Sequence, residues 1–163
     1  MAAKTKERKD AIELLKQDHE KVRGLLRQLE KAATDDAADA EPLLRSIESA
    51  LHVHTTIEEE IFYPAFRDAA SKREDAKLFY DAMEEHCVVD LLLPEIDKGE
   101  FGSHDFAAKA KVLRDLVEHH AEEEEKEMFP RARKLIGEDE LVMLGRQLAE
   151  RKHELQGEDD DEE

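Results

Sequence analysis

Two stretches of this chain share one pattern: HTTIEEEIFYP runs from His54 to Pro64, and HAEEEEKEMFP runs from His120 to Pro130. In both, a glutamate follows the histidine by four residues, and an aromatic residue and a proline end the stretch. Residues four apart lie one turn apart on nearly the same face of a helix, so each stretch presents an imidazole and a carboxylate to one point. The repeated pattern therefore predicts a metal site between two helices.

The duplication extends to the segments before these stretches. The acidic residue and histidine at Asp18 and His19 recur 67 positions later as Glu85 and His86, so each half reads as a pair of helices. His19 and His86 fall within apolar stripes, where a polar side chain costs free energy unless it is paired. The sequence thus predicts six metal ligands: His19, His54, Glu58, His86, His120 and Glu124.

The types and order of these donors restrict the kind of site. In four-helix bundles, inward side chains from facing helices build dinuclear centres, and imidazole with carboxylate suits iron or manganese better than a thiolate metal. Ferritin-like sites place a glutamate three residues before a histidine, whereas here the histidine precedes the glutamate by four. The zinc-protease pattern HExxH does not occur in the chain.

The rest of the chain is typical of an all-α protein. Glycine and proline are scarce, and apolar residues recur at intervals of three and four. We expect an antiparallel up-down-up-down four-helix bundle with a short C-terminal helix. The expected helices cover about 8–33, 42–64, 73–98, 103–130 and 138–155. The expected organisation is an N-terminal extension (1–9), the bundle (10–135), the C-terminal helix (136–155) and a solvated acidic tail (156–163).

Composition narrows the partners and the compartment. The formal net charge of −18 argues against nucleic acid or an anionic membrane surface, since both need a basic protein surface. The single cysteine, Cys87, excludes an internal disulfide, and no apolar run approaches the length of a membrane span. We expect a cytoplasmic protein, either a monomer or a homodimer.

Four segments together resemble the haemerythrin-like HHE cation-binding domain: DHEKVR, HTTIEEEIFYP, EEHCVV and HAEEEEKEMFP. The resemblance covers about residues 10–135. It implies an antiparallel four-helix bundle holding a non-haem di-iron centre, bridged by two carboxylates and an oxo or hydroxo group, with manganese or zinc as possible substitutes. In that family the four histidines of the pattern match the terminal imidazole ligands, and Glu58 and Glu124 match the bridging carboxylates.

The sequence departs from oxygen-carrying haemerythrins at one position. Those proteins have a second histidine four residues after the one on the third helix, whereas here Asp90 follows His86 by four. We expect Asp90 to be an additional ligand or a close neighbour, and Arg23 to pair with Asp90 or to stand beside bound peroxide. Tyr63 and Tyr80 are candidates to reach the site as hydrogen-bond donors or oxidisable groups.

Some positions have competing interpretations. His119 competes with His120 for the ligand role, because the two are 100° apart on a helix. Glu59 and Glu125 are candidates to hydrogen-bond the site from outside the ligand set. We expect Cys87 to be a small buried hydrophobe, with a redox thiol as the alternative.

Two functions from different classes follow from this site. The first is a redox protein that binds or reduces oxygen or hydrogen peroxide, including a peroxide-consuming enzyme of the catalase or peroxidase type. The second is a non-catalytic module that binds or senses iron, oxygen or nitric oxide. An iron-free helical interaction protein is a third interpretation, but it leaves four inward histidines unexplained.

Overall fold

A computed structural model describes residues 8–35 and 37–161, and within these ranges the elements are all helical. The long helices are α1 (Ala11–Asp35), α2 (Ala40–Ile57), α4 (Arg73–Asp97), α5 (His104–Glu123) and α7 (Glu138–Asp161). Two shorter helices, α3 (Tyr63–Ala69) and α6 (Phe129–Leu135), and a 3-10 turn, η1 (Ala37–Asp39), complete the described part. The predicted all-α fold is confirmed.

The two repeated stretches form π-helical turns. One turn, η2 (Glu58–Phe62), joins α2 to α3, and the other, η3 (Glu124–Met128), joins α5 to α6. In η2 the backbone N–H of Tyr63 donates to the carbonyl of Glu58, five residues earlier. Prolines follow in the first turns of α3 and α6, where a missing N–H is tolerated. Such turns often occur at functional sites, and here each begins at a predicted glutamate ligand.

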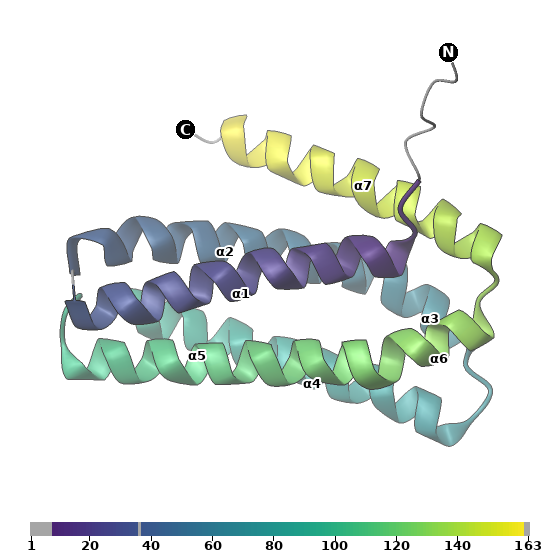
Figure 1. The fold of residues 1–163 in the computed structure, drawn as a ribbon, viewed down its shortest axis with the longest axis horizontal. Helices are drawn as coiled ribbons and strands as arrows, with labels where there is room; N and C mark the ends of the chain where they lie inside the picture. Colours follow the sequence, from purple (N-terminus) through teal and green to yellow (C-terminus); the bar gives the residue numbers. More distant parts are fainter. Residues whose placement is uncertain (1–7, 36, 162–163) are drawn as a thin grey trace, which may run out of the picture.

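Four rods lie side by side and form the bundle (Figure 1). They are α1, α2 continued by α3, α4, and α5 continued by α6, and each packs against its neighbours in antiparallel order. Ser103 caps α5 as a helix start should, because its side chain accepts a hydrogen bond from the N–H of Phe106. None of the described helices is long and apolar enough to cross a membrane.

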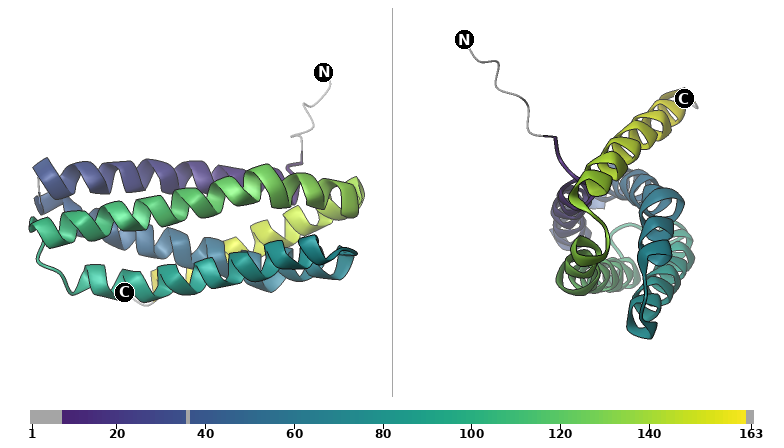
Figure 2. Two further views of the ribbon diagram at one scale, coloured as in Figure 1. Left: turned by 90° about the horizontal axis from the view of Figure 1, so that it is seen from below. Right: turned by 90° about the vertical axis from the view of Figure 1, so that its right-hand side faces the viewer.

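Helix α7 lies outside the bundle and packs across α1, α2 and η2 (Figure 2). It continues to Asp161, past the predicted helix end at residue 155 and into the segment predicted as an acidic tail. Gly145 makes the close packing possible, since a Cβ there would lie 2.7 Å from the carbonyl oxygen of Lys9. Residues 1–7 of the predicted N-terminal extension lie outside the described residues.

The buried side chains divide into two hydrophobic clusters with polar residues between them. One cluster lies toward α3, α6 and α7 and contains Leu15, Ile57, Ala82 and Met128, and the other lies toward η1 and contains Val22, Leu51, Val89 and Val117. On every rod of the bundle, the predicted histidine ligand falls between a residue of the first cluster and a residue of the second. The fold therefore places all four histidines at one level of the bundle interior.

Candidate metal centre

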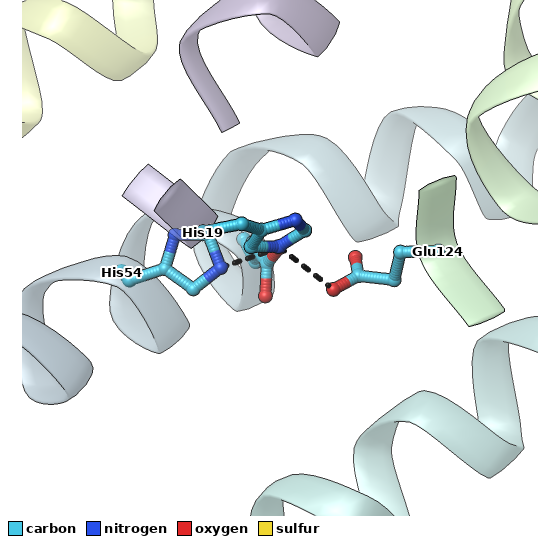
Figure 3. Close-up of side chains that lie close together, drawn as sticks. His19, His54 and Glu124 are labelled. Atoms are coloured by element: carbon cyan, nitrogen blue, oxygen red, sulfur yellow. Dashed lines mark ion pairs between the residues drawn. The ribbon is translucent and has the colours of Figure 1, made fainter. Parts of the chain in front are cut away.

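The predicted ligands meet in this polar layer. His19, His54, Glu58, His86, His120 and Glu124 are all buried, with exposed fractions between 0% and 7%. Figure 3 shows His19 on α1, His54 on α2 and Glu124 from η3 turned toward one another. Buried ionisable groups require partners, because an isolated charge in a low-dielectric interior is strongly destabilised.

Glu58 lies between the two halves of the site. Its Oε1 is 3.0 Å from Nε2 of His54, and its Oε2 is 3.1 Å from Nε2 of His86. Glu124 also connects the halves, because its Oε1 lies 2.7 Å from Nε2 of His120 and 3.5 Å from Nε2 of His19. Each carboxylate thus faces one histidine of each half, as a bridging ligand requires.

The donor atoms form two groups that share Glu58. In each group the candidate ligand atoms lie within 4.8 Å of one another: His19, His54, Glu58 and Glu124 in one, and Glu58, His86 and His120 in the other. Four buried atoms make no hydrogen bond within the described part of the chain: Nε2 of His19 and His54, and Oε1 of Glu58 and Glu124. These orphaned polar atoms come from three of the four rods and face one common point, which fits a bound cation.

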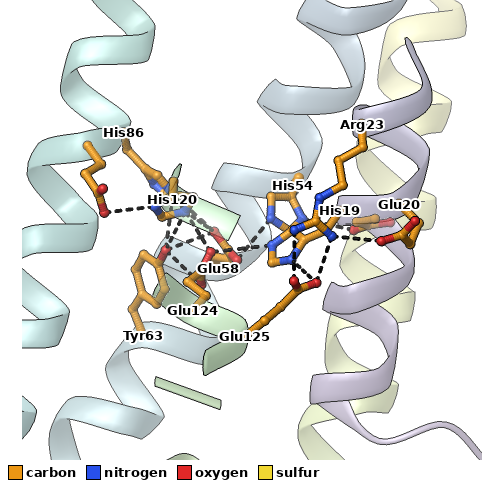
Figure 4. Close-up of polar contacts among 12 residues, drawn as sticks. His19, Glu20, Arg23, His54, Glu58, Tyr63, His86, His120, Glu124 and Glu125 are labelled. Carbon is orange, nitrogen blue, oxygen red and sulfur yellow. Dashed lines mark hydrogen bonds and ion pairs between the residues drawn. The ribbon is translucent and has the colours of Figure 1, made fainter. Parts of the chain in front are cut away.

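A second ring of carboxylates orients the histidines from behind, and Figure 4 shows one of them, Glu125, beside His19. Each Nδ1 faces one carboxylate: His19 faces Glu125 (3.2 Å), His54 faces Asp18 (3.2 Å), His86 faces Glu59 (3.3 Å) and His120 faces Glu85 (3.1 Å). An imidazole that donates from Nδ1 presents the lone pair of Nε2 inward, which is the usual arrangement of a metal-binding histidine. The placement of Glu59 and Glu125 agrees with their expected supporting role.

Sequence reasoning assigned no role to Asp18 and Glu85, although a signal was present. Both precede a histidine ligand on their own helix, and the repeated acid–histidine pair marked their positions. In the fold, each orients the histidine of the neighbouring helix in its own half. The spacing that repeats between the two halves of the chain thus extends to the supporting carboxylates.

Tyr63 reaches the centre of the site, whereas Tyr80 does not. The hydroxyl of Tyr63 donates to Oε2 of Glu58 at 3.0 Å or to Oε2 of Glu124 at 3.2 Å, and it lies 3.1 Å from Nε2 of His86. An α-helix would turn residues five apart about 140° away from each other. The π-turn η2 removes this offset, so Tyr63 stands over Glu58. Tyr80 is 63% exposed at the surface of α4.

The structure does not bring Asp90 to the site. Its side chain is exposed, and the inward residue after His86 is Val89. Arg23 accordingly does not pair with Asp90. It binds Glu125 through Nη2 at 2.9 Å and thereby holds the carboxylate that faces His19. The expected place of Asp90 at the site and its expected pair with Arg23 are therefore corrected, whereas the alternative for Arg23, a place beside bound peroxide, stays a prediction.

The fold also decides the positions of two residues next to the candidate ligands, His119 and Cys87. His120 points inward, whereas the side chain of His119 is 62% exposed and pairs at the surface with Glu85 and Glu123. Cys87 is exposed, so its predicted burial was wrong. It follows a ligand on an α-helix and therefore faces away from the bundle interior.

The carboxylates of the site favour the charged form of His54. Burial lowers the pKa of His54, but the carboxylates of Glu58 and Asp18 outweigh burial and raise this pKa to about 10. Burial raises the pKa of Glu58, but the charge of His54 and the hydrogen bonds of the histidines hold it well below its usual value. A cation at the inward-facing atoms would supply the positive charge that these protons otherwise provide.

A helical bundle with two imidazole–carboxylate groups around shared glutamates, each histidine oriented by an outer carboxylate, is a cation-binding bundle protein. The family model of the hemerythrin HHE cation binding domain matches residues 10–132. The chain belongs to this family.

Known relatives agree with this assignment. A crystal structure of a hemerythrin HHE cation binding domain-containing protein from Mycobacterium kansasii, a homolog of Rv2633c, superposes with a TM-score of 0.79 at 28% identity. The match covers 92% of this chain and 89% of that one. Two uncharacterized proteins, Rv2633c of Mycobacterium tuberculosis and Mb2666c of Mycobacterium bovis, are each 26% identical over 149 residues, covering 91% of this chain and 88% of theirs.

Proposed function

We propose that this protein holds two iron ions and uses them to bind or reduce oxygen or hydrogen peroxide. The observation that carries the proposal is the position of Glu58, which the two donor groups share. His19 and His54 would hold one ion, His86 and His120 the other, and Glu58 and Glu124 would bridge them. When bound, an iron pair supplies electrons to oxygen or peroxide, and manganese or zinc would fit the same donors.

A small apolar cavity beside the ligands supports a small substrate. Its volume is about 20 Å³, and apolar side chains of all four rods contribute to its lining: Val22, Leu51, Val89 and Val117. A space of this size admits about one water-sized molecule. Oxygen, nitric oxide and hydrogen peroxide are of this class, and the apolar lining excludes bulk water from the site.

Tyr63 would hold a proton at the centre. Burial and the charges of Glu124 and Glu58 raise the pKa of Tyr63 well above its usual value of 10, so its hydroxyl stays protonated. This proton lies between two carboxylates and beside His86. The hydroxyl can donate a hydrogen bond to an oxygen atom of the substrate, and its oxygen is also the candidate for a further ligand on the His86 side.

Elemental analysis of protein from iron-supplemented cells tests this proposal. We expect about two irons per chain. Glu58→Gln and Glu124→Gln should each reduce the iron content to less than one per chain, because each removes charge from both positions. Glu122→Gln is the matched control, since Glu122 pairs with Lys126 on the surface. Equal iron loss in the control, or no iron in any form, would exclude the site.

The alternative is a non-catalytic module that binds or senses iron, oxygen or nitric oxide. It is favoured by α7, which lies beyond the family match and contacts Asp18 through Lys152. Peroxide consumption separates the two functions. An enzyme consumes many equivalents per chain, whereas a sensor reacts once and changes the protease sensitivity of α7.

A further inference from the structure

The chain contains two tyrosines and no tryptophan, and one aromatic ring connects the two tyrosines. Tyr63 is buried at the metal centre, and Tyr80 is exposed on α4. The Phe79 ring packs on both. Its centroid lies 6.1 Å from that of Tyr63, at an interplanar angle of 86°, and 5.1 Å from that of Tyr80, at 74°. A continuous line of rings thus leads from the site to the surface.

This arrangement matters because the cavity at the site is small. A space of about 20 Å³ excludes any organic electron donor. Electrons from such a donor must therefore cross protein to reach the site. Tunnelling rates fall steeply with distance, and an oxidisable phenol at each end of a packed ring shortens every step.

Each phenol has a nearby acceptor for the proton that it releases when it is oxidised. The hydroxyl of Tyr63 donates to Oε2 of Glu58 at 3.0 Å or to Oε2 of Glu124 at 3.2 Å. Tyr80 faces water, which takes its proton directly. Phe79 has no ionisable hydrogen and serves as the packed medium between the two phenols.

We propose that Tyr63, Phe79 and Tyr80 form an electron route by which a phenolic donor in solution reduces the oxidised site without entering it. This inference rests on the proposed reduction of peroxide. Hydrogen peroxide takes two electrons and two protons to give two waters, and two donor phenols each lose one electron and one proton. In each transfer Tyr63 passes an electron inward and its proton to the neighbouring carboxylate, and takes that same proton back when an electron arrives from Tyr80. Tyr80 releases its own proton to water, so the two protons that peroxide consumes are matched by the two that the donor phenols release to the solvent. The donor then restores the electron and proton of Tyr80.

The route can be tested without the metal. In metal-free protein, photoexcited ruthenium tris(bipyridine) with persulfate oxidises exposed residues from solution, and electron paramagnetic resonance detects the tyrosyl radicals. The spectrum of Tyr63→Phe, which retains only Tyr80, gives the Tyr80 signal, and the Tyr63 signal is the part of the wild-type spectrum that is absent from it. We expect a Tyr63 radical in the wild type and its loss by at least about tenfold in Tyr80→Phe. A Tyr63 signal of wild-type size in Tyr80→Phe, or no Tyr63 signal in the wild type, would overturn the route.

Iron-loaded protein supplies the second measurement. With hydrogen peroxide and guaiacol as the donor, Tyr80→Phe should slow guaiacol oxidation about tenfold, and Tyr80→Trp should restore it because indole is also oxidisable. Equal rates in the three proteins would overturn the role of Tyr80. If the loaded protein does not react with peroxide, the proposed function fails, and the radical measurement in metal-free protein still decides the route.

Discussion

Asp18 places one carboxylate oxygen 3.2 Å from Nδ1 of His54 and uses the other to form an ion pair with Lys152 of α7. The equivalent residue of the other half, Glu85, reaches His120 in the same way, but its second oxygen faces the exposed His119. Through Lys152, helix α7 therefore supports the carboxylate behind His54, whereas the equivalent carboxylate behind His120 pairs with His119. A duplicated site has acquired different surroundings on its two sides.

Asp18→Asn should weaken one metal position more than the other. In the wild type, the charge of Asp18 orients His54 and makes its imidazole more basic, and the substitution removes this charge. Mutation of such an outer partner lowers metal affinity by about 10–100-fold. We expect a loss of this size for one of two ions in a calorimetric titration with Co²⁺. Glu85→Gln should produce the same loss through His120. Equal weakening of both ions by either substitution would contradict separate support of the two groups.

Lys152→Met should have a smaller effect through the same contact. It keeps the apolar stem of the side chain but removes the ammonium group, leaving Asp18 less firmly held. We expect a loss of about 1 kcal/mol in unfolding free energy, with weaker metal binding than in the wild type but stronger binding than in Asp18→Asn. Denaturant unfolding and the same titration measure both quantities.

Lys126→Met is the matched control for this substitution. The side chain of Lys126 is 71% exposed and pairs with Glu122 at the surface. An exposed pair of this kind contributes less than about 1 kcal/mol. If both lysine substitutions change metal binding equally, the effect comes from net charge rather than from the contact with Asp18.

The metal-free protein should lose stability as pH rises above neutrality. The pKa of His54 rises from 6.5 to about 10 on folding, because Glu58 and Asp18 outweigh burial, so its stabilising contribution is complete below pH 6.5. That contribution disappears as pH rises from 6.5 through about 10. The pKa values of His19 and His120 are also raised, against the effect of burial, by Glu124 and further carboxylates, so they act in the same direction.

Thermal unfolding at several pH values tests this dependence. Each kcal/mol corresponds to about 2–4 °C for a chain of this size, so the Tm of the metal-free protein should fall by several degrees between about pH 6.5 and pH 9.5. The metal-loaded protein should change much less, because a bound cation keeps the imidazoles unprotonated throughout. A Tm of the metal-free protein that rises over this range would contradict the raised pKa values of His19, His54 and His120.

The convergence of the candidate ligands was predictable from sequence because duplication supplied an internal comparison. The 66-residue offset selected Glu58 and Glu124 from runs of acidic residues and His120 over His119. Asp90 had no such comparison, and its placement depended on assuming a four-residue step after His86. The buried positions of α4 alternate in steps of four and three: Asp75, Phe79, Ala82, His86 and Val89. The step after His86 is three, which turns Asp90 toward solvent.

Other features depended on contacts that local patterns do not encode. Each π-turn lies directly before a proline-containing turn, whereas the sequence pattern predicted helices that end near Pro64 and Pro130. The role of Lys152 depends on the path of α7 across the bundle. A lysine in an acidic, solvated helix gives no sign that its ammonium group will meet Asp18. The contact of α7 with the outer carboxylates was therefore visible only in the fold.

The docking of α7 itself can be tested at Gly145. A Cβ at this position would lie 2.7 Å from the carbonyl oxygen of Lys9 and 3.0 Å from the backbone nitrogen of Ala11, and these backbone atoms cannot rotate away. Gly145→Ala should therefore push α7 off α1 and cost about 1–3 kcal/mol, although alanine favours helices. It should also reproduce the weaker metal binding of Lys152→Met, because the same displacement separates Lys152 from Asp18.

Gly24→Ala is the control: nothing lies within 4 Å of its Cβ, so it should stabilise α1 by about 0.5–1 kcal/mol and leave metal binding unchanged. Retention of wild-type metal affinity in a destabilised Gly145→Ala protein would show that α7 supports the fold without supporting the site.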